Sequence, residues 1–165
     1  HDGILRYSLY PAADVSDAKT EQAQQYIRQL ADSLDYVGTL TLELFDTDTG
    51  LVANEVAPRV HNSGHWSIEG AATSQFRNHM LAVAGKPLGS THSRYPAVAM
   101  LNVISDEAPT EAATGLTNAF VHSYGKEARP ARKLGHVTVV ANSTTERDNT
   151  ITQLAGLMPA GVWQH

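Results

Sequence analysis

The sequence predicts an α+β fold in which helices flank antiparallel pairs of strands. Two apolar runs flank a short turn at residues 48–50, which is typical of a hairpin. Three segments repeat their apolar residues at helical spacing, and three further apolar runs of strand length follow residue 96. With 165 residues, 42% of them hydrophobic, the chain is long enough to bury a sizeable core.

The first half of the chain predicts a strand, a helix, the hairpin and a second helix. The strand covers residues 4–10, and Ser16 or Asp17 caps a helix that reaches about Asp35. One face of this helix carries Ala23, Tyr26, Ile27, Leu30, Ala31 and Leu34. After the hairpin and an irregular stretch, the second helix is expected from about Thr73 to Ala84, before Gly85 and Pro87. Its expected buried stripe is Phe76, Met80, Val83 and Ala84.

A segment rich in Gly, Pro, Ser and Thr at residues 86–96 predicts a boundary between two units, residues 1–90 and 91–165. The second unit is expected to be a small, mixed, β-rich lobe. Its predicted strands are Ala97–Ile104, Phe120–Tyr124 and His136–Ala141. Thr144 or Thr145 should cap a last helix reaching about Met158, with Ile151, Leu154, Ala155 and Met158 at helical spacing.

Two acidic residues are expected to face each other across the hairpin. A three-residue loop of Asp48, Thr49 and Gly50 pairs Thr47 with Leu51, Phe45 with Ala53, and Glu43 with Glu55. Directly opposed like charges destabilise a sheet, so a pair specified by both turn and alternation indicates a cation between the carboxylates. Carboxylate oxygens suit Mg²⁺, although Ca²⁺ is an alternative. The other interpretation is an exposed sheet face on which Lys or Arg neutralises each acid.

The segment after the hairpin carries polar side chains suited to an anionic ligand. Arg59, His61, Asn62, Ser63 and His65 supply a guanidinium, two imidazoles, an amide and a hydroxyl within seven residues. The two histidines have the i, i+4 spacing of a helical zinc pair, but Pro58 and Gly64 interrupt helical continuity and no third ligand is evident. A ligand-binding loop is favoured over zinc and over ordinary surface contacts.

Composition excludes several classes of protein. The formal net charge is −5 and the pI is about 5.9, which disfavours a general nucleic-acid binder. The chain has no cysteine, so it has no disulfide framework and no thiolate zinc site, as is usual in the reducing cytoplasm. Neither an apolar run long enough to span a bilayer nor a signal peptide is present, so no membrane association is expected.

Two long segments resemble a known enzyme family. Residues 43–91, ELFDTDTGLVANEVAPRVHNSGHWSIEGAATSQFRNHMLAVAGKPLGST, are similar to the metal and substrate segment of the 5-(carboxyamino)imidazole ribonucleotide synthase family of ATP-grasp enzymes in purine biosynthesis. The run HSYGKEARPARKLGHVTV resembles that family's carboxy-terminal signature. The related formate-dependent glycinamide ribonucleotide transformylases read His-Asp-Thr-Gly-Met where this chain has His61-Asn62-Ser63-Gly64-His65. These residues favour the carboxylating family.

The resemblance implies an enzyme that uses MgATP and bicarbonate to carboxylate aminoimidazole ribonucleotide through carboxyphosphate. It implies that Glu43 and Glu55 ligate Mg²⁺ at the nucleotide phosphates, with Asn54 also beside ATP. Arg59 and His61 would be the catalytic residues that orient bicarbonate, carboxyphosphate or the amine. The loop residues Asn62, Ser63 and His65 would contact substrate. A homodimer is compatible with the resemblance.

A basic cluster near the carboxy terminus completes the expected site. Taken alone, its charges indicate a solvated loop. The resemblance instead implies that Lys126 and Arg132 hold the ribonucleotide 5′-phosphate, with Arg129 and Lys133 as second choices. The family usually has glycine where this chain has Ala131, which affects the loop rather than its charge.

Two other departures from the family pattern concern the metal and the length. Ala57 stands where many ATP-grasp enzymes carry a third metal ligand, so the metal would depend on water and phosphate. Family members are much longer, and this chain has no glycine-rich phosphate loop to replace their amino-terminal part. We therefore expect the carboxy-terminal half of an ATP-grasp domain plus the small lobe, inactive alone. Alternatives are a transformylase-like enzyme and a non-catalytic metal-binding or anion-binding module.

Overall fold

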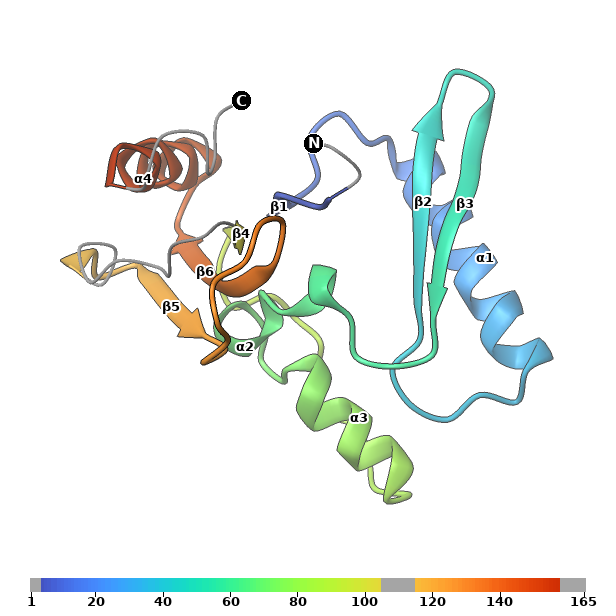
Figure 1. Cartoon of the computed structure of the whole chain (residues 1–165). Helices are drawn as coiled ribbons and strands as arrows, with labels where there is room; N and C mark the ends of the chain where they lie inside the picture. The colour runs from blue at the N-terminus through green and yellow to red at the C-terminus, as the bar shows by residue number, and fades with distance from the viewer. Residues whose placement is uncertain (1–3, 105–114, 158–165) are drawn as a thin grey trace.

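The computed structural model describes residues 4–104 and 115–157, and within them it confirms the predicted α+β fold (Figure 1). One sheet has four antiparallel strands in the order β1-β4-β6-β5. Its strands are β1 (Tyr7–Tyr10), β4 (Ala97–Ile104), β5 (Ala119–Ser123) and β6 (Lys133–Ala141). A separate hairpin is formed by β2 (Thr41–Thr47) and β3 (Gly50–Ala57). The helices are α1 (Asp17–Ser33), α2 (Ser67–Gly70), α3 (Gln75–Val83) and α4 (Thr144–Leu157).

The main core lies between the four-stranded sheet and α4. Strand β4 has the bounds predicted from its apolar run, and every one of its residues is buried, because it is a central strand with α4 on one face and α2 on the other. Alternate side chains of β4 and β6 meet Ile151 and Leu154 of α4 on one face of the sheet. The cluster comprises Ala99, Leu101, Val103, Ala119, Val137, Val139, Ile151 and Leu154.

The opposite face of the same sheet supports α2 and the segment that leads into it. A Cβ added at Gly70 would lie 3.0 Å from Val98, so α2 packs closely on this face. Three polar residues of the sheet are buried here: Asn102, His136 and Thr138. The polar face therefore lies beneath residues 61–70, which carry most of the predicted loop site.

The hairpin packs one face against α1 (Figure 1). Ser16 caps α1 by accepting a hydrogen bond from the Lys19 backbone N–H, as predicted. A groove of about 500 Å³ between the helix and the hairpin is lined by apolar side chains that include Ile27, Leu42 and Leu44. Lys19 Nζ lies 2.6 Å from Asp46 Oδ1 and links the two elements at its edge.

Several predicted bounds and contacts need correction. The α3 stripe is not buried in this chain, because no described element covers that face. Phe76, Met80 and Val83 are 37%, 65% and 60% exposed, and Ala84 is exposed as well. The cap of α4 is Ser143 rather than Thr144 or Thr145, since its Oγ accepts from the Glu146 N–H. The first strand is limited to Tyr7–Tyr10. The predicted end of α4, Met158, lies outside the described residues.

The strand that follows the basic loop begins earlier than predicted. Its expected start was His136, but β6 starts at Lys133, because Lys133 pairs with Ile104 across a register shift. Lys133 is thus part of the sheet rather than of the exposed loop. Within residues 4–104 and 115–157, no helix combines the length and apolar character needed to cross a bilayer.

Candidate functional site

The two predicted acidic residues face each other in the hairpin, as expected, but through a different register near the turn. Thr47 pairs with Gly50 and Leu44 with Ala53, so the predicted pairs Thr47–Leu51 and Phe45–Ala53 are wrong. The loop has two residues, Asp48 and Thr49, rather than three. A β-bulge between Glu43 and Leu44 then adds one residue on β3, which restores the pairing of Glu43 with Glu55.

The bulge also directs a side chain toward the acids. Asn54 has no partner residue on β2 in the ladder, and its Nδ2 donates to Glu43 Oε2 at 3.3 Å. Bulged residues often turn a side chain in this way. Asn54, predicted beside the nucleotide, therefore lies within reach of the same carboxylate that was predicted to bind metal.

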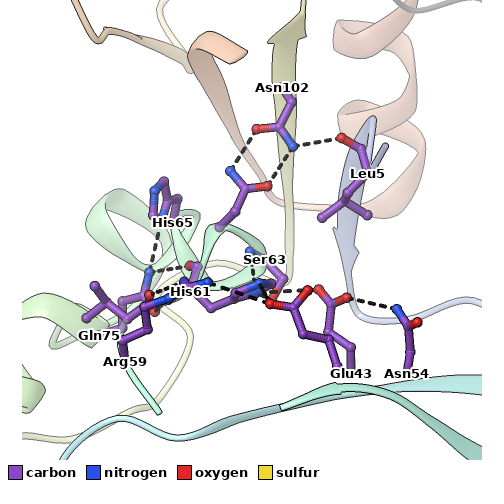
Figure 2. A network of polar contacts seen from close by, with 12 residues as sticks. Leu5, Glu43, Asn54, Arg59, His61, Ser63, His65, Gln75 and Asn102 are labelled. Carbon is purple, nitrogen blue, oxygen red and sulfur yellow. Dashed lines mark hydrogen bonds and ion pairs between the residues drawn. The ribbon is translucent and has the colours of Figure 1, made fainter. Parts of the chain in front are cut away.

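The imidazole of His61 contacts both carboxylates, and Figure 2 shows it beside Glu43. Its Nδ1 is 3.4 Å from Glu43 Oε1, and its Nε2 is 3.7 Å from Glu55 Oε1. The Ser63 hydroxyl contacts His61 Nδ1 at 2.9 Å, and only 8% of His61 is exposed. The ring is therefore held nearly out of water within reach of both acids.

Two cationic side chains flank the acids. Arg59 Nη2 is 3.6 Å from Glu55 Oε1, but both side chains are about half exposed, so this ion pair contributes little to stability. Lys133 Nζ donates to Asn62 Oδ1 at 3.1 Å. Partial burial lowers the pKa of Lys133, while Glu43 and Glu55 act in the opposite direction. The alternative in which Lys or Arg neutralises the acids is therefore supported for Glu55, which Arg59 approaches.

A cavity of about 290 Å³ brings these groups together. Its lining includes five predicted site residues and one second choice: Glu43, Asn54, Glu55, His61, Asn62 and Lys133. A neighbouring cavity of about 640 Å³ runs along the outer side of β2 and includes Glu43, Asn54 and Ser63 in its lining. Charged groups therefore stand beside a larger, more apolar space, an arrangement that suits a ligand with a polar and a flat apolar part.

The remaining predicted residues lie outside the 290 Å³ cavity. Lys126 Nζ lies over the ring of Tyr124, 5.1 Å from its centroid, and Arg132 Nη1 donates to the Glu127 carbonyl at 3.3 Å. His65 is turned inward, where its Nδ1 is 2.9 Å from Gln75 Nε2. Burial is the main reason that the pKa of His65 is lowered.

The zinc interpretation gains no support from the structure. Residues Asn62–Gly64 form a 3-10 turn, so His61 and His65 are not on one face of an α-helix. Across the described part of the chain, no group of three or more His, Cys, Asp or Glu side chains could hold a metal ion. The Glu43–Glu55 pair offers carboxylate oxygens, the ligand type preferred by a hard ion that keeps water or phosphate as its other ligands.

Sequence reasoning missed two residues that hold the loop. Asn102, fully buried in β4, exchanges two amide hydrogen bonds with Asn62, at 2.8 and 2.7 Å. Its Nδ2 also donates to the Leu5 carbonyl at 2.9 Å. Gln75 contacts the backbone of His61. The only sequence signal for Asn102 was one amide inside an otherwise apolar strand.

A second cluster of rings lies behind the loop. His136 is 1% exposed, stacks on His122 with centroids 4.4 Å apart, and contacts Tyr124 Oη through Nδ1 at 2.8 Å. Burial, with smaller contributions from His122 and His65, lowers the pKa of His136 to about 3. His122 Nε2 is 2.8 Å from Glu69 Oε1. This cluster is uncharged at His136 and supports the polar face of the sheet.

Comparison with known proteins identifies relatives along almost the whole chain. The model of the ATP-grasp domain matches residues 1–76, and that of the phosphoribosylaminoimidazole carboxylase C-terminal domain matches residues 98–150. The N5-carboxyaminoimidazole ribonucleotide synthase of Vibrio parahaemolyticus is 43% identical over 157 residues, which are 95% of this chain and 41% of that protein.

Solved structures give the same result. The synthetase from Thermus thermophilus superposes with a TM-score of 0.91 at 45% identity, covering 99% of this chain and 45% of that one. The Aspergillus clavatus synthase, solved in complex with ADP and 5-aminoimidazole ribonucleotide, gives 0.87 at 36% identity over 95% of this chain and 44% of its own. The chain spans less than half the length of these relatives. Along almost its whole length the chain is similar in sequence and in fold to N5-carboxyaminoimidazole ribonucleotide synthases, and its first 76 residues match the ATP-grasp domain.

Proposed function

We propose that this chain forms the metal and phosphate side of the site in an ATP-grasp ligase. The reaction is the carboxylation of the exocyclic amine of 5-aminoimidazole ribonucleotide with ATP and bicarbonate. The observation that carries this proposal is the convergence of Glu43, Glu55 and His61 on one cavity with Lys133 at its wall. The similarity to N5-carboxyaminoimidazole ribonucleotide synthases, including the Aspergillus clavatus relative solved with ADP and 5-aminoimidazole ribonucleotide, supports it.

The proposed reaction has two steps. A bicarbonate oxygen attacks the γ-phosphorus of ATP, which forms carboxyphosphate and releases ADP. The amine then attacks the carboxyphosphate carbon, phosphate leaves, and the amine proton passes to a base. The product is a carbamate. Positioning and charge stabilisation are the main tasks of the protein in such a reaction.

The carboxylates have a defined role in this scheme. Glu43 and Glu55 would hold Mg²⁺, which would neutralise negative charge on the nucleotide phosphates when bound. Asn54, beside Glu43, is placed to contact the nucleotide. Neither acid has an interior position, so both carboxylates can reach a bound ion without loss of a core contact.

The loop residues would handle the small anionic reactants. His61 is within 4 Å of both carboxylates and could accept or return a proton at Nε2. Arg59 is exposed on the same side and could fork onto bicarbonate or carboxyphosphate. Asn62 and Ser63 fix this loop, and we propose them, with His65, as its substrate-contacting residues.

The ribonucleotide phosphate would be held by the basic segment. Lys126 and Arg132 remain the proposed pair, since both lie outside the sheet. The contacts described for them are with the Tyr124 ring and the Glu127 carbonyl, not with a carboxylate. Lys133 at the cavity wall is the third cation. We also propose the division into residues 1–90 and 91–165, and homodimerisation, as features of the full-length protein.

The decisive experiment is a phosphate-release assay on the full-length protein. With MgATP, bicarbonate and 5-aminoimidazole ribonucleotide, we expect stoichiometric ADP, phosphate and carbamate. Omission of bicarbonate should abolish turnover. Turnover with formate and glycinamide ribonucleotide instead would favour the transformylase alternative, and binding of Mg²⁺ without any turnover would favour a non-catalytic module.

A further inference from the structure

Gln75 is the first residue of α3, and its side chain contacts the loop that carries His61 (Figure 2). Gln75 Oε1 accepts from the His61 backbone N–H at 3.0 Å. Gln75 Nε2 donates to the His61 carbonyl at 2.7 Å. One amide thus pairs with both backbone groups of His61 in the manner of a neighbouring strand.

The same amide fixes a second imidazole. A backbone N–H only donates and a carbonyl only accepts, so the contacts with His61 determine which end of the Gln75 amide is nitrogen. The second hydrogen of Nε2 is left for His65 Nδ1, 2.9 Å away. His65 must then accept at Nδ1 and carry its proton at Nε2.

Gln75 is itself anchored at its backbone. Ser74 caps α3 by accepting from the Arg77 N–H, and the Gln75 N–H donates to Ser67 Oγ at 3.0 Å. Ser67 Oγ donates in turn to the Gly64 carbonyl at 2.6 Å. The amide therefore extends from a fixed helix terminus and is not a loose side chain that happens to reach the loop.

Gly64 provides the space that the amide needs. A Cβ built at Gly64 would lie 2.6 Å from Gln75 Oε1 and 2.9 Å from Cδ. Such a contact would push the amide away and break its hydrogen bonds with His61. Gly64 is needed here because of this close approach, not because of its backbone angles.

We propose that Gln75 is a positioning residue that holds His61 between Glu43 and Glu55. This inference rests on the proposed function, because it assigns Gln75 a role only through His61. The imidazole is 3.4 and 3.7 Å from the two acids, so a small rotation of the His61 backbone would separate it from at least one of them. Displacements of about 1 Å in such groups can cost about 100-fold in rate.

The first test compares steady-state kinetics of Gln75→Ala with the wild type in the full-length protein. We expect kcat to fall about 10-fold to 100-fold, with KM for MgATP and for 5-aminoimidazole ribonucleotide changed less than about 3-fold. The matched control is Gln22→Ala, whose amide donates to Tyr26 Oη on the exposed face of α1. An unchanged kcat, or an effect confined to KM, would overturn the proposal.

Two further variants test whether a loss of kcat comes from these hydrogen bonds rather than from unfolding or an unspecific effect. Gln75→Glu has the same shape and keeps the acceptor for His61 N–H, but it loses both donors, so kcat should again fall. Gly64→Ala should lower kcat through the same hydrogen bonds, and Gly64→Ala combined with Gln75→Ala should cost no more than Gln75→Ala alone. Multiplicative losses would mean that the two residues act separately, which contradicts the proposal.

A measurement independent of turnover separates this inference from the proposed function. Imidazole ¹⁵N spectra at neutral pH should place the His65 proton on Nε2 in the wild type, and Gln75→Ala should shift the His61 and His65 signals. If the wild type has no carboxylating activity but gives these spectra, the proposed function fails and the Gln75 geometry stands. If His65 carries its proton on Nδ1 in an active wild type, the Gln75 inference fails alone.

Discussion

The two faces of the four-stranded sheet differ in what they bury. Toward α4 the sheet presents Leu101, Val137 and Val139, all fully buried among apolar neighbours. Toward residues 61–70 it presents Asn102, His136 and Thr138, which are 0%, 1% and 0% exposed. The same strands, β4 and β6, therefore supply a purely apolar core on one side and, on the other, a layer in which buried polar residues lie beside Val98 and Met100.

The polar layer is costly unless its groups are hydrogen-bonded. Asn102 meets this condition through Asn62 and Leu5. In the described part of the chain, His136 Nε2 and Thr138 Oγ1 are buried without a hydrogen-bond partner. This comparison teaches that the α4 side provides stability, whereas the loop side trades stability for a fixed arrangement of polar groups beneath the site.

The largest expected effect lies on the apolar face. Leu154→Ala should lower the free energy of unfolding by about 2–5 kcal/mol, because Leu154 is fully buried in the α4 cluster. Leu157→Ala in the same helix should change it by less than about 0.5 kcal/mol, since Leu157 is 42% exposed. Urea unfolding of the full-length protein measures both. Equal effects of the two substitutions would show that the apolar face is not the main source of stability.

The next effect sharpens the role of the loop side. Glu55→Gln should reduce kcat by about 100-fold and raise the Mg²⁺ concentration needed for half-maximal rate, because an amide cannot replace the carboxylate charge. Unfolding free energy should change little, since the Glu55 side chain is 48% exposed. Glu21→Gln on exposed α1 is the control. Unchanged kinetics in Glu55→Gln would reject its ligand role.

A pH titration tests the buried polar layer directly. Unfolded histidine binds a proton below about pH 6.5, whereas His136 in the fold stays neutral down to its pKa of about 3. The unfolded state therefore binds more protons in this window, and stability falls as pH falls from about 6.5 toward 3. From pH 7.5 to 5 the loss from His136 should be about 2 kcal/mol.

The measurement is the urea midpoint at pH 7.5 and pH 5. His136→Gln should flatten the difference between the two, and His92→Gln, at an exposed histidine outside this cluster, serves as the control. A pH dependence that survives unchanged in His136→Gln would show that another group causes it.

The smallest expected effect concerns Asn102. Asn102→Ala removes the paired amide bonds to Asn62 and should lower the free energy of unfolding by about 1 kcal/mol. It should also lower kcat by about 3-fold to 10-fold through the loop. Asn118→Ala, which loses the bond to Thr150 of α4, should destabilise without a change in kcat. Identical kinetics for the two variants would mean that the loop face of the sheet is no more important for catalysis than the α4 face.

The sequence predicted features that depend on local pattern. The apolar run of β4, the Ser16 cap of α1 and the facing of Glu43 and Glu55 follow from alternation, capping chemistry and turn position. The stripe of α3 was recognised, but helical spacing reveals an apolar face without saying what covers it. Met80 is accordingly 65% exposed in this chain.

Contacts between distant residues could not be predicted in this way. Asn62 and Asn102 are 40 residues apart, and His61 and Gln75 are 14 apart. No periodicity links such pairs, because they meet only when the loop packs on β4 and α3. Lys133 was assigned to a loop since lysine and glycine at residues 133 and 135 are poor strand signals, yet pairing with β4 extends β6 to include them.

The bulge at Asn54 makes the hairpin tolerant of compensated changes in length. The short loop and the extra residue on β3 shift the pairing by one position in opposite senses, so their effects cancel at Glu43 and Glu55. A homologue with one more residue in the loop and none at the bulge would present the same two acids to each other. Such a homologue would lack the amide that reaches Glu43. A residue can therefore be moved from the bulge to the loop without changing the acid pair, but the contact made by Asn54 would be lost.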